Sequence, residues 1–262
     1  MDTNAFLAQK YKITVDALNF VKKAEEELKE VFAGFDETAS FNTYKVLHAF
    51  REANIQNRHF VGTTGYGYSD EGRDKLGELF AQIFGAEAAF VSPQIASGTH
   101  AITIALFGLL RPLDTMLSIT GKPYDTLAQV IGIGNGKASG SLADFAIKYQ
   151  QVDLLPDSTI NIQAVLDNLY LNKSIKMVYI QRSRGYEMRK SLTIAQIAEA
   201  IKAVKTKFPQ MKVVVDNCYG EFTEVLEPTD VGADLMIGSL IKNPGGGLAP
   251  TGAYLVGTKE CV

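Results

Sequence analysis

Residues 213–217, Val-Val-Val-Asp-Asn, decide the fold class of this chain. Three consecutive β-branched residues followed at once by a carboxylate are typical of a buried strand that ends in a polar side chain. Lys242 follows a second apolar stretch, 235–237, further along the chain. The carboxyl ends of parallel strands meet at one edge of a sheet, and ligands bind there. Residues 213–217 therefore predict a parallel sheet with Asp216 at the edge where ligands bind.

The same alternation of apolar strands and amphipathic helices extends over most of the chain. Strands are expected at 88–91, 115–119, 149–152, 176–180, 212–216, 235–237 and 253–256. Helices are expected between them at 73–84, 98–110, 125–131, 162–170 and 193–207. Because parallel neighbours need crossover helices, this order predicts an α/β fold with a mostly parallel sheet and helices on both faces.

The N-terminal region departs from this pattern. Helical spacing of apolar residues predicts helices at 14–33 and 43–53, and the glycine-rich stretch 60–72 predicts a ligand-contacting loop. We divide the chain into 1–60, a helical arm with the start of the domain, and 61–262, a large domain. The chain stops six residues after the last expected strand. We therefore expect a C-terminal small domain to be missing.

Composition limits the function classes. The chain has 262 residues, 46% of them apolar, so a sizeable core is possible. Its 26 basic and 29 acidic residues leave a net charge of −3, which gives no global attraction to nucleic acid or anionic lipid. Two cysteines, and three histidines without metal-ligand spacing, predict no metal site. With no signal peptide and no membrane span, the sequence predicts a cytoplasmic protein with a small-molecule ligand.

Ser97, Gly98 and Thr99 lie at the start of the helix expected at 98–110. Two hydroxyls, a permissive backbone and the free amides of a helix N-terminus make an anion site, for which phosphate is the natural ligand. The alternative is an ordinary helix cap, because capping favours the same residue types. The stretch alone leaves both interpretations open.

Asp216 and Lys242 together indicate a function that neither residue indicates alone. A carboxylate at a strand end can hold a cation or a protonated ring nitrogen, although metal binding and loop capping are alternatives. A lysine after an apolar strand can form a Schiff base with an aldehyde, although most lysines lie at the surface. A phosphate site, a strand-end aspartate and a later lysine together are typical of a pyridoxal-phosphate enzyme, which must bind the phosphate, pair with the pyridine nitrogen and form a Schiff base.

Longer motifs carry a specific resemblance. They are Thr64–Tyr68 (TGYGY), Pro93–His100 (PQIASGTH), Thr120–Thr126 (TGKPYDT), Gln181–Tyr186 (QRSRGY), Val215–Phe222 (VDNCYGEF) and Gly238–Gly247 (GSLIKNPGGG). With these motifs in this order, the chain resembles the fold-type I pyridoxal-phosphate enzymes of cysteine and methionine metabolism. Within them it is similar to the methionine gamma-lyase-related, or aluminium-resistance, branch, whose members are cystathionine beta-lyase-like. The resemblance covers nearly the whole chain and implies the large domain of the pyridoxal-phosphate-dependent transferase fold.

The resemblance assigns roles to the predicted site. It implies that Lys242 is the Schiff-base lysine, that Asp216 pairs with the pyridine nitrogen, and that Tyr124 stacks on the cofactor ring. The phosphate would be held by Ser97, Gly98, Thr99 and Ser239. In the reaction, Lys242 would remove the substrate α-proton, and Tyr124 would assist the leaving thiol as a general acid.

Two further pairs of residues concern the partner and the substrate. Tyr66 and Tyr68 resemble the loop that reaches the phosphate site of a neighbouring subunit, which implies a homodimer or homotetramer. Related lyases have an arginine where this chain has Asp70. Arg182 and Arg184 follow the strand expected at 176–180, where an arginine could bind a substrate carboxylate. A solvated or ion-paired arginine is the alternative for either.

The sequence thus predicts a pyridoxal-phosphate-dependent carbon-sulfur lyase acting by elimination on a sulfur-containing amino acid of the cystathionine or methionine type. Two alternatives stay open. One is a different reaction on the same cofactor, such as that of an aminotransferase or a racemase. The other is a chain that binds pyridoxal phosphate and is catalytically inactive.

Overall fold

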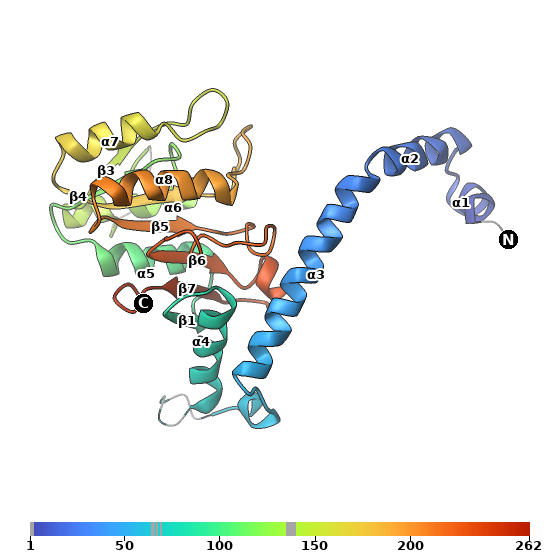
Figure 1. The fold of residues 1–262 in the computed structure, drawn as a ribbon, viewed down its shortest axis with the longest axis horizontal. Coiled ribbons are helices and arrows are strands. Elements are labelled where there is room, and N and C mark those ends of the chain that lie inside the picture. Colours follow the sequence, from blue (N-terminus) through green and yellow to red (C-terminus); the bar gives the residue numbers. More distant parts are fainter. Residues whose placement is uncertain (1–2, 64–65, 67, 69, 135–139) are drawn as a thin grey trace.

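The fold is built on one seven-stranded sheet, seen in a computed structural model that describes residues 3–63, 66, 68, 70–134 and 140–262 (Figure 1). The strands are β1 (Ala88–Ser92), β2 (Thr115–Ser118), β3 (Lys148–Gln151), β4 (Ile175–Gln181), β5 (Lys212–Asp216), β6 (Leu235–Ser239) and β7 (Ala253–Gly257). Their order in the sheet is β1-β7-β6-β5-β4-β2-β3. All seven expected strands are present.

The sheet is mixed but mostly parallel, which confirms the predicted fold class. Strands β6, β5, β4, β2 and β3 run parallel to one another, and β7 runs antiparallel between β1 and β6. The sequence pattern did not indicate the reversed strand, because apolar stretches have the same pattern in either direction.

Helices cover both faces of the sheet. Helices α5 (Gly98–Leu109) and α6 (Asp125–Ile131) pack on the face that includes Val214, and α7 (Ile162–Leu171) and α8 (Ile194–Lys207) pack on the face that includes Val213 and Val215. All three valines are fully buried, because β5 lies in the middle of the sheet with helices on either side. The continuous β-branched run therefore fills two cores at once.

Local sequence explains where these helices begin. The Ser97 hydroxyl caps α5 by accepting a hydrogen bond from the His100 amide at 3.2 Å. Thr193 caps α8 in a reciprocal arrangement with Gln196. Such caps satisfy amides that have no partner within the helix. Short 3-10 helices lie at Asn57–Phe60, Leu142–Phe145 and Asn243–Gly245.

A third core joins the N-terminal helices to the sheet edge. Helix α4 (Glu71–Ile83) lies beside the end of α3 (Lys29–Glu52) and packs against β1 and β7. At its centre the rings of Phe84 and Tyr254 are stacked, with centroids 5.4 Å apart. This cluster fixes the direction in which α3 leaves the body.

The N-terminal helices form an arm that projects from the body (Figure 1). They are α1 (Thr3–Tyr11), α2 (Val15–Glu27) and α3. Helices were predicted at 14–33 and 43–53, with a gap between them, and this gap was wrong. The break falls at Leu28, and α3 then runs unbroken over 24 residues. The boundary proposed between residues 60 and 61 stays a prediction.

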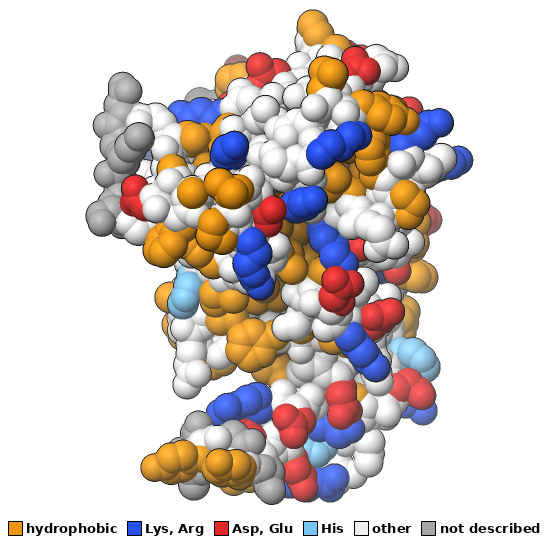
Figure 2. All heavy atoms as spheres, turned by 90° about the vertical axis from the view of Figure 1, so that its left-hand side faces the viewer, with side chains coloured by type: hydrophobic (Ala, Val, Ile, Leu, Met, Phe, Trp, Pro, Cys, Tyr) orange, Lys and Arg blue, Asp and Glu red, His pale blue; other side chains and the backbone are white. Residues whose placement is uncertain are grey.

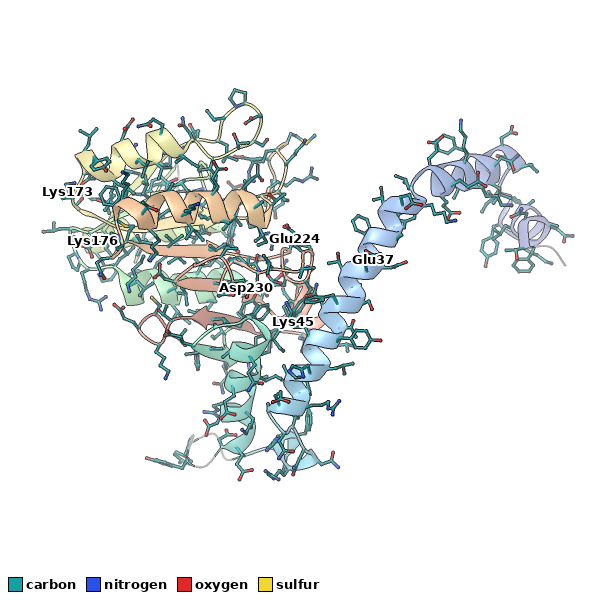
Figure 3. All side chains as sticks on the ribbon, viewed as in Figure 1. Glu37, Lys45, Lys173, Lys176, Glu224 and Asp230 are labelled. Atoms are coloured by element: carbon teal, nitrogen blue, oxygen red, sulfur yellow. The ribbon has the colours of Figure 1, made fainter. Side chains whose placement is uncertain are left out.

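A tertiary contact anchors α3 where the sequence predicted no helix. Asn42, which is buried, donates hydrogen bonds of 3.1 Å to the carbonyl oxygens of Phe222 and Glu224. Lys45 lies one turn further on, with its ammonium 5.6 Å from the Phe222 ring centroid. Figure 3 shows Lys45 and Glu224 where α3 meets the body, with Glu37 further out along the helix.

The surface carries charges of both signs. On the face turned to the viewer in Figure 2, lysine and arginine side chains are interspersed with acidic and apolar ones. The described part of that face therefore creates no field of a single sign. Among the described residues, no helix has both the length and the apolar character that crossing a bilayer requires.

Candidate active site

The ends of the central strands bring the predicted site together. Asp216 ends β5 and is paired in register with Gln181 at the end of β4, while Ser239 ends β6. Gly98, at the start of α5, is so close that an added Cβ would lie 2.9 Å from Cys218 Sγ and 3.5 Å from Ser239 Cβ. The start of α5 and the ends of β5 and β6 thus form one site.

Asp216 is a buried acid, with 2% of its surface exposed. Its carboxylate accepts hydrogen bonds from the Cys218 amide at 3.1 Å and from the Tyr179 hydroxyl at 3.3 Å. Burial raises its pKa, and the opposing effects of these hydrogen bonds and of the Lys242 charge do not cancel the rise. None of the ion pairs between described residues includes Asp216. A protonated ring nitrogen would supply the missing cation, so this residue fits pyridoxal phosphate.

The start of α5 combines a cap with possible anion donors. The cap uses a lone pair of the Ser97 oxygen, so the hydroxyl hydrogen stays available as a donor. Because Gly98 has no side chain, the start of α5 can approach Cys218 and Ser239 closely. Helix α5 has 12 residues, so its N-terminus carries a full helix dipole. The predicted cap and the predicted anion site are therefore compatible here.

Tyr124 lies over the same region and is held at two points. Its hydroxyl is 2.9 Å from Thr99 Oγ1, and its backbone amide donates to Gln181 Oε1 at 3.1 Å. Burial, and to a smaller degree the charge of Asp216, raise the pKa of Tyr124. The hydroxyl therefore keeps its proton at neutral pH and can donate it.

Ser239 and Lys242 occupy the turn after β6. The Ser239 hydroxyl is buried and donates to the Gly252 carbonyl at 3.3 Å. Lys242 is half-buried, and its amine donates a hydrogen bond to the Tyr219 hydroxyl. The Lys242 Nζ also lies 4.1 Å from the centroid of the Tyr219 ring.

Arg182, for which the sequence predicted substrate binding or an ion pair, is only 3% exposed. Its five N–H groups are all used by acceptors in the protein: the carbonyls of Leu192 and Gly220, Asn217 Oδ1, Thr223 Oγ1 and Glu224 Oε1. A substrate carboxylate would have to displace one of these acceptors. Arg182 therefore holds the loop after β5, as the ion-paired alternative proposed.

The remaining predicted residues lie outside this cluster. Arg184 is exposed, and so are Tyr66 and Tyr68, at 83% and 85%. Residues 64, 65, 67 and 69 of the tyrosine loop lie outside the described residues. Asp70, which replaces the arginine of related lyases, caps α4 and pairs with Arg73 at 3.0 Å. No contact described within this chain joins Tyr66 or Tyr68 to the site around Asp216.

Sequence reasoning missed four residues that support the site. Tyr179 and Gln181 lie in an apolar strand, where the sequence pattern indicates core residues. Only the fold shows that Tyr179 contacts Asp216 and that Gln181 contacts Tyr124. Tyr219 and Glu221 lie inside the motif Val215–Phe222, but no spacing rule distinguishes them. The signal that could have pointed to Tyr219 and Glu221 was their closeness to Asp216 in the sequence.

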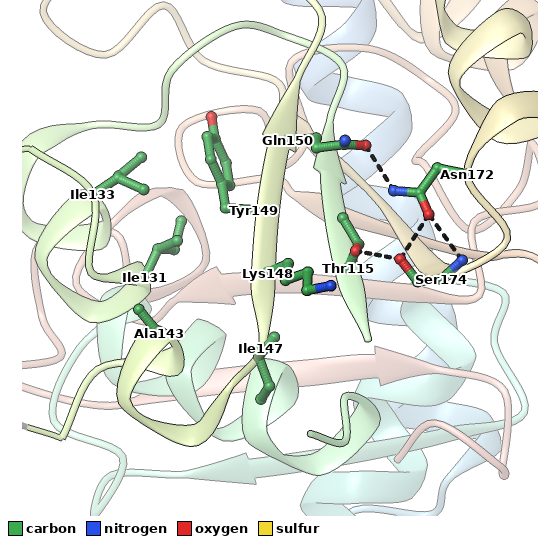
Figure 4. A pocket seen from close by; sticks show the side chains of 10 residues that line it. All are labelled: Thr115, Ile131, Ile133, Ala143, Ile147, Lys148, Tyr149, Gln150, Asn172 and Ser174. Atoms are coloured by element: carbon green, nitrogen blue, oxygen red, sulfur yellow. Dashed lines mark hydrogen bonds between the residues drawn. The ribbon is translucent and has the colours of Figure 1, made fainter. Parts of the chain in front are cut away.

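A separate hollow of about 480 Å³ lies where β2 and β3 begin (Figure 4). Its wall includes Thr115, which is hydrogen-bonded to Ser174 at 2.7 Å, and Lys148. None of the predicted site residues lines it. The hollow is therefore distinct from the site at the other ends of the strands.

Comparison with known proteins gives consistent matches. The pattern of the family described as "Methionine gamma-lyase" matches residues 17–262. The uncharacterized protein YnbB of Bacillus subtilis is 52% identical over 92% of this chain and 58% of its own length. The crystal structure of a carbon-sulfur lyase involved in aluminum resistance from Clostridium novyi NT is 46% identical, with a TM-score of 0.95 over 100% of this chain and 62% of that chain. The chain thus spans about 60% of the length of these relatives.

A more distant likeness concerns the fold alone. The pyridoxal-5'-phosphate dependent protein YhfS from Escherichia coli is 16% identical, with a TM-score of 0.62 over 87% of this chain and 56% of that chain. It supports the assignment of the sheet and its flanking helices to fold type I.

Proposed function

Because the chain belongs to the methionine gamma-lyase family, we propose that it is the cofactor-binding part of a pyridoxal-phosphate-dependent carbon-sulfur lyase. Its substrate is a sulfur-containing amino acid of the cystathionine or methionine type, and the reaction is an elimination. The observation that carries this proposal is a buried Asp216 that forms no ion pair with any described residue and lies close to a half-buried lysine and a helix N-terminus.

The residues divide the binding of the cofactor between them. Asp216 holds the ring nitrogen, and Lys242 provides the amine that bonds to the cofactor aldehyde. Ser97, Gly98, Thr99 and Ser239 bind the phosphate. Tyr124 covers the ring. When bound, pyridoxal phosphate supplies an electron sink next to the α-carbon of the substrate.

Two side chains of this chain move protons. Lys242 carries an amine that, once released from the cofactor, removes the substrate α-proton. Tyr124 keeps its hydroxyl proton because burial raises its pKa, and it donates that proton to the leaving thiol. Arg182 takes no part, since its donors hold the loop after β5.

The test is covalent fixation of the cofactor. The purified chain is incubated with pyridoxal phosphate and reduced with borohydride, and the modified peptide is identified by mass spectrometry. We expect cofactor on Lys242 in wild type and in Lys202→Ala, a control at an exposed lysine of α8, and none in Lys242→Ala. Equal fixation in Lys242→Ala would refute the assignment, and no fixation in wild type would refute cofactor binding by this chain.

Product analysis separates elimination from the other reactions of this cofactor. Elimination from a sulfur amino acid releases a thiol, ammonia and a keto acid. Transamination yields a keto acid without ammonia, and racemisation yields only the other enantiomer. A chain that fixes the cofactor and forms none of these products would be the catalytically inactive alternative.

We also propose that the chain forms a homodimer or homotetramer. Large apolar side chains are exposed along the arm: Phe20, Val21, Val31, Phe32, Phe35, Phe41, Tyr44 and Leu47. Exposed apolar area of this kind marks protein interfaces, and the exposed Tyr66 and Tyr68 would meet the phosphate site of the neighbouring copy. Light scattering that gives a monomer mass at micromolar concentration would refute this. The cytoplasmic location stays a prediction.

A further inference from the structure

Tyr219 occupies a tight turn directly after β5. The Gly220 amide donates to the Asn217 carbonyl at 2.7 Å and closes the turn. Tyr219 itself has a φ of 69°, in the left-handed region that residues other than glycine seldom adopt. Such conformations persist only where surrounding contacts enforce them.

Two side chains, one buried and one exposed, enforce this turn. Arg182 donates to Asn217 Oδ1 and to the Gly220 carbonyl, both at 2.8 Å. Asn243, the residue after Lys242, donates its side-chain amide to the carbonyls of Tyr219 at 3.2 Å and Glu221 at 2.8 Å. The turn after β5 is thus tied to the segment that carries Lys242.

The side chain of Tyr219 is not held by burial. It is 58% exposed, and the contacts described for it are with Lys242: a hydrogen bond from Nζ to the hydroxyl, and Nζ over the ring at 4.1 Å. The hydrogen bond and the nearby aromatic ring both hold the amine beside this residue. None of the ion pairs between described residues includes Lys242. The strained turn therefore presents a tyrosine to this lysine.

We propose that Tyr219 is a positioning residue that holds the amine of Lys242 at the site while that amine is not bonded to the cofactor. This inference rests on the function proposed for Lys242. Tyr219 keeps the lysine from extending into solvent, both before the cofactor binds and after a substrate amine has displaced the lysine.

The test measures the exposure of Lys242 without any cofactor. The cofactor-free chain is pulse-labelled with acetic anhydride, and the rate at Lys242 is divided by the rate at Lys202 in the same sample. Removing one hydrogen bond in Tyr219→Phe should raise this ratio about fivefold. Tyr219→Ala, which also removes the ring, should raise it further. Tyr186→Phe, at a tyrosine that is 91% exposed, is the matched control and should leave the ratio unchanged.

The outcomes separate this inference from the proposed function. A ratio in Tyr219→Phe equal to that of wild type, with an unchanged melting temperature, would overturn the role of Tyr219. Borohydride fixation of pyridoxal phosphate is measured in parallel on the same proteins. Absence of fixation in wild type would refute the proposed function whatever the labelling ratio. A raised ratio, together with slower fixation in Tyr219→Phe than in Tyr186→Phe, is the expected result.

Discussion

The carboxylate of Glu221 accepts a hydrogen bond of 2.7 Å from the hydroxyl of Tyr254, and both side chains are buried beneath the site. The second carboxylate oxygen, Oε2, has no hydrogen-bond partner among the residues that the structure describes. Burial raises the pKa of Glu221 to about 7. The group is therefore largely protonated below neutral pH, when its cost of burial is small.

This pair predicts a pH dependence of stability. A folded pKa raised from its ordinary value of 4.5 to about 7 means that the folded chain binds the proton more tightly than the unfolded chain. The stabilisation is complete below about pH 4.5 and is lost as the pH rises through about 7, a loss of roughly 1–3 kcal/mol. In Glu221→Gln this loss should disappear. Urea unfolding of the cofactor-free chain at pH 5 and pH 8 measures it, and an equal loss in both proteins would contradict the prediction.

Replacing Asp216 by asparagine should affect stability and cofactor binding in opposite ways. Burial raises the pKa of Asp216, so its stabilising contribution is likewise lost as the pH rises. In Asp216→Asn the amide oxygen can accept from the Cys218 amide, and the amide nitrogen would donate to the Tyr179 hydroxyl instead of accepting from it. The variant has no buried charge, so its cofactor-free form should melt at the same or a higher temperature at pH 8. Its affinity for pyridoxal phosphate should fall at least about tenfold, as for the loss of a buried charge partner.

Asp157→Asn is the control for that experiment. Asp157 is exposed, and a hydrogen bond from Thr159 lowers its pKa. Its replacement should not raise the melting temperature, and cofactor affinity should not change. A gain in stability in both variants would show that the effect does not come from burial of Asp216.

Arg182→Ala should destabilise the fold. The change removes a donor from Glu224 and from several other acceptors, and it removes the positive charge beside the buried Glu227, so we expect the free energy of unfolding to fall by about 3–5 kcal/mol. Arg184→Ala, two residues away and exposed, should change it by less than about 0.5 kcal/mol. Chemical denaturation of both variants makes the comparison. Normal stability in Arg182→Ala would restore Arg182 as a candidate for binding the substrate.

Gly98→Ala tests the close approach at the start of α5. The new Cβ would lie 2.9 Å from Cys218 Sγ, so the turn after β5 must move and cofactor affinity should fall. Adding Cys218→Ala should restore part of that affinity, because the sulfur is the atom in the way. Gly108→Ala, in the same helix with open space around it, should instead raise stability by about 0.5–1 kcal/mol. Equal affinities in wild type and Gly98→Ala, measured by titration, would contradict the prediction.

The arm shows where local pattern was insufficient. The sequence pattern predicted helices at 14–33 and 43–53 and none at 34–42. The helix continues because Asn42 reaches carbonyl groups about 180 positions away in the chain. Propensity is a weak preference, and a contact of this kind overrides it.

The sequence by itself determined the strands, the parallel class of the sheet and the position of Asp216 at a strand end. These follow from local signals: β-branched runs, helical spacing and caps act over a few residues. Only the tertiary structure decided the reversal of β7, the burial of Arg182 among five acceptors and the contact of Tyr219 with Lys242. Each depends on groups far apart in the chain, and their distances and burial are set only when the sheet assembles.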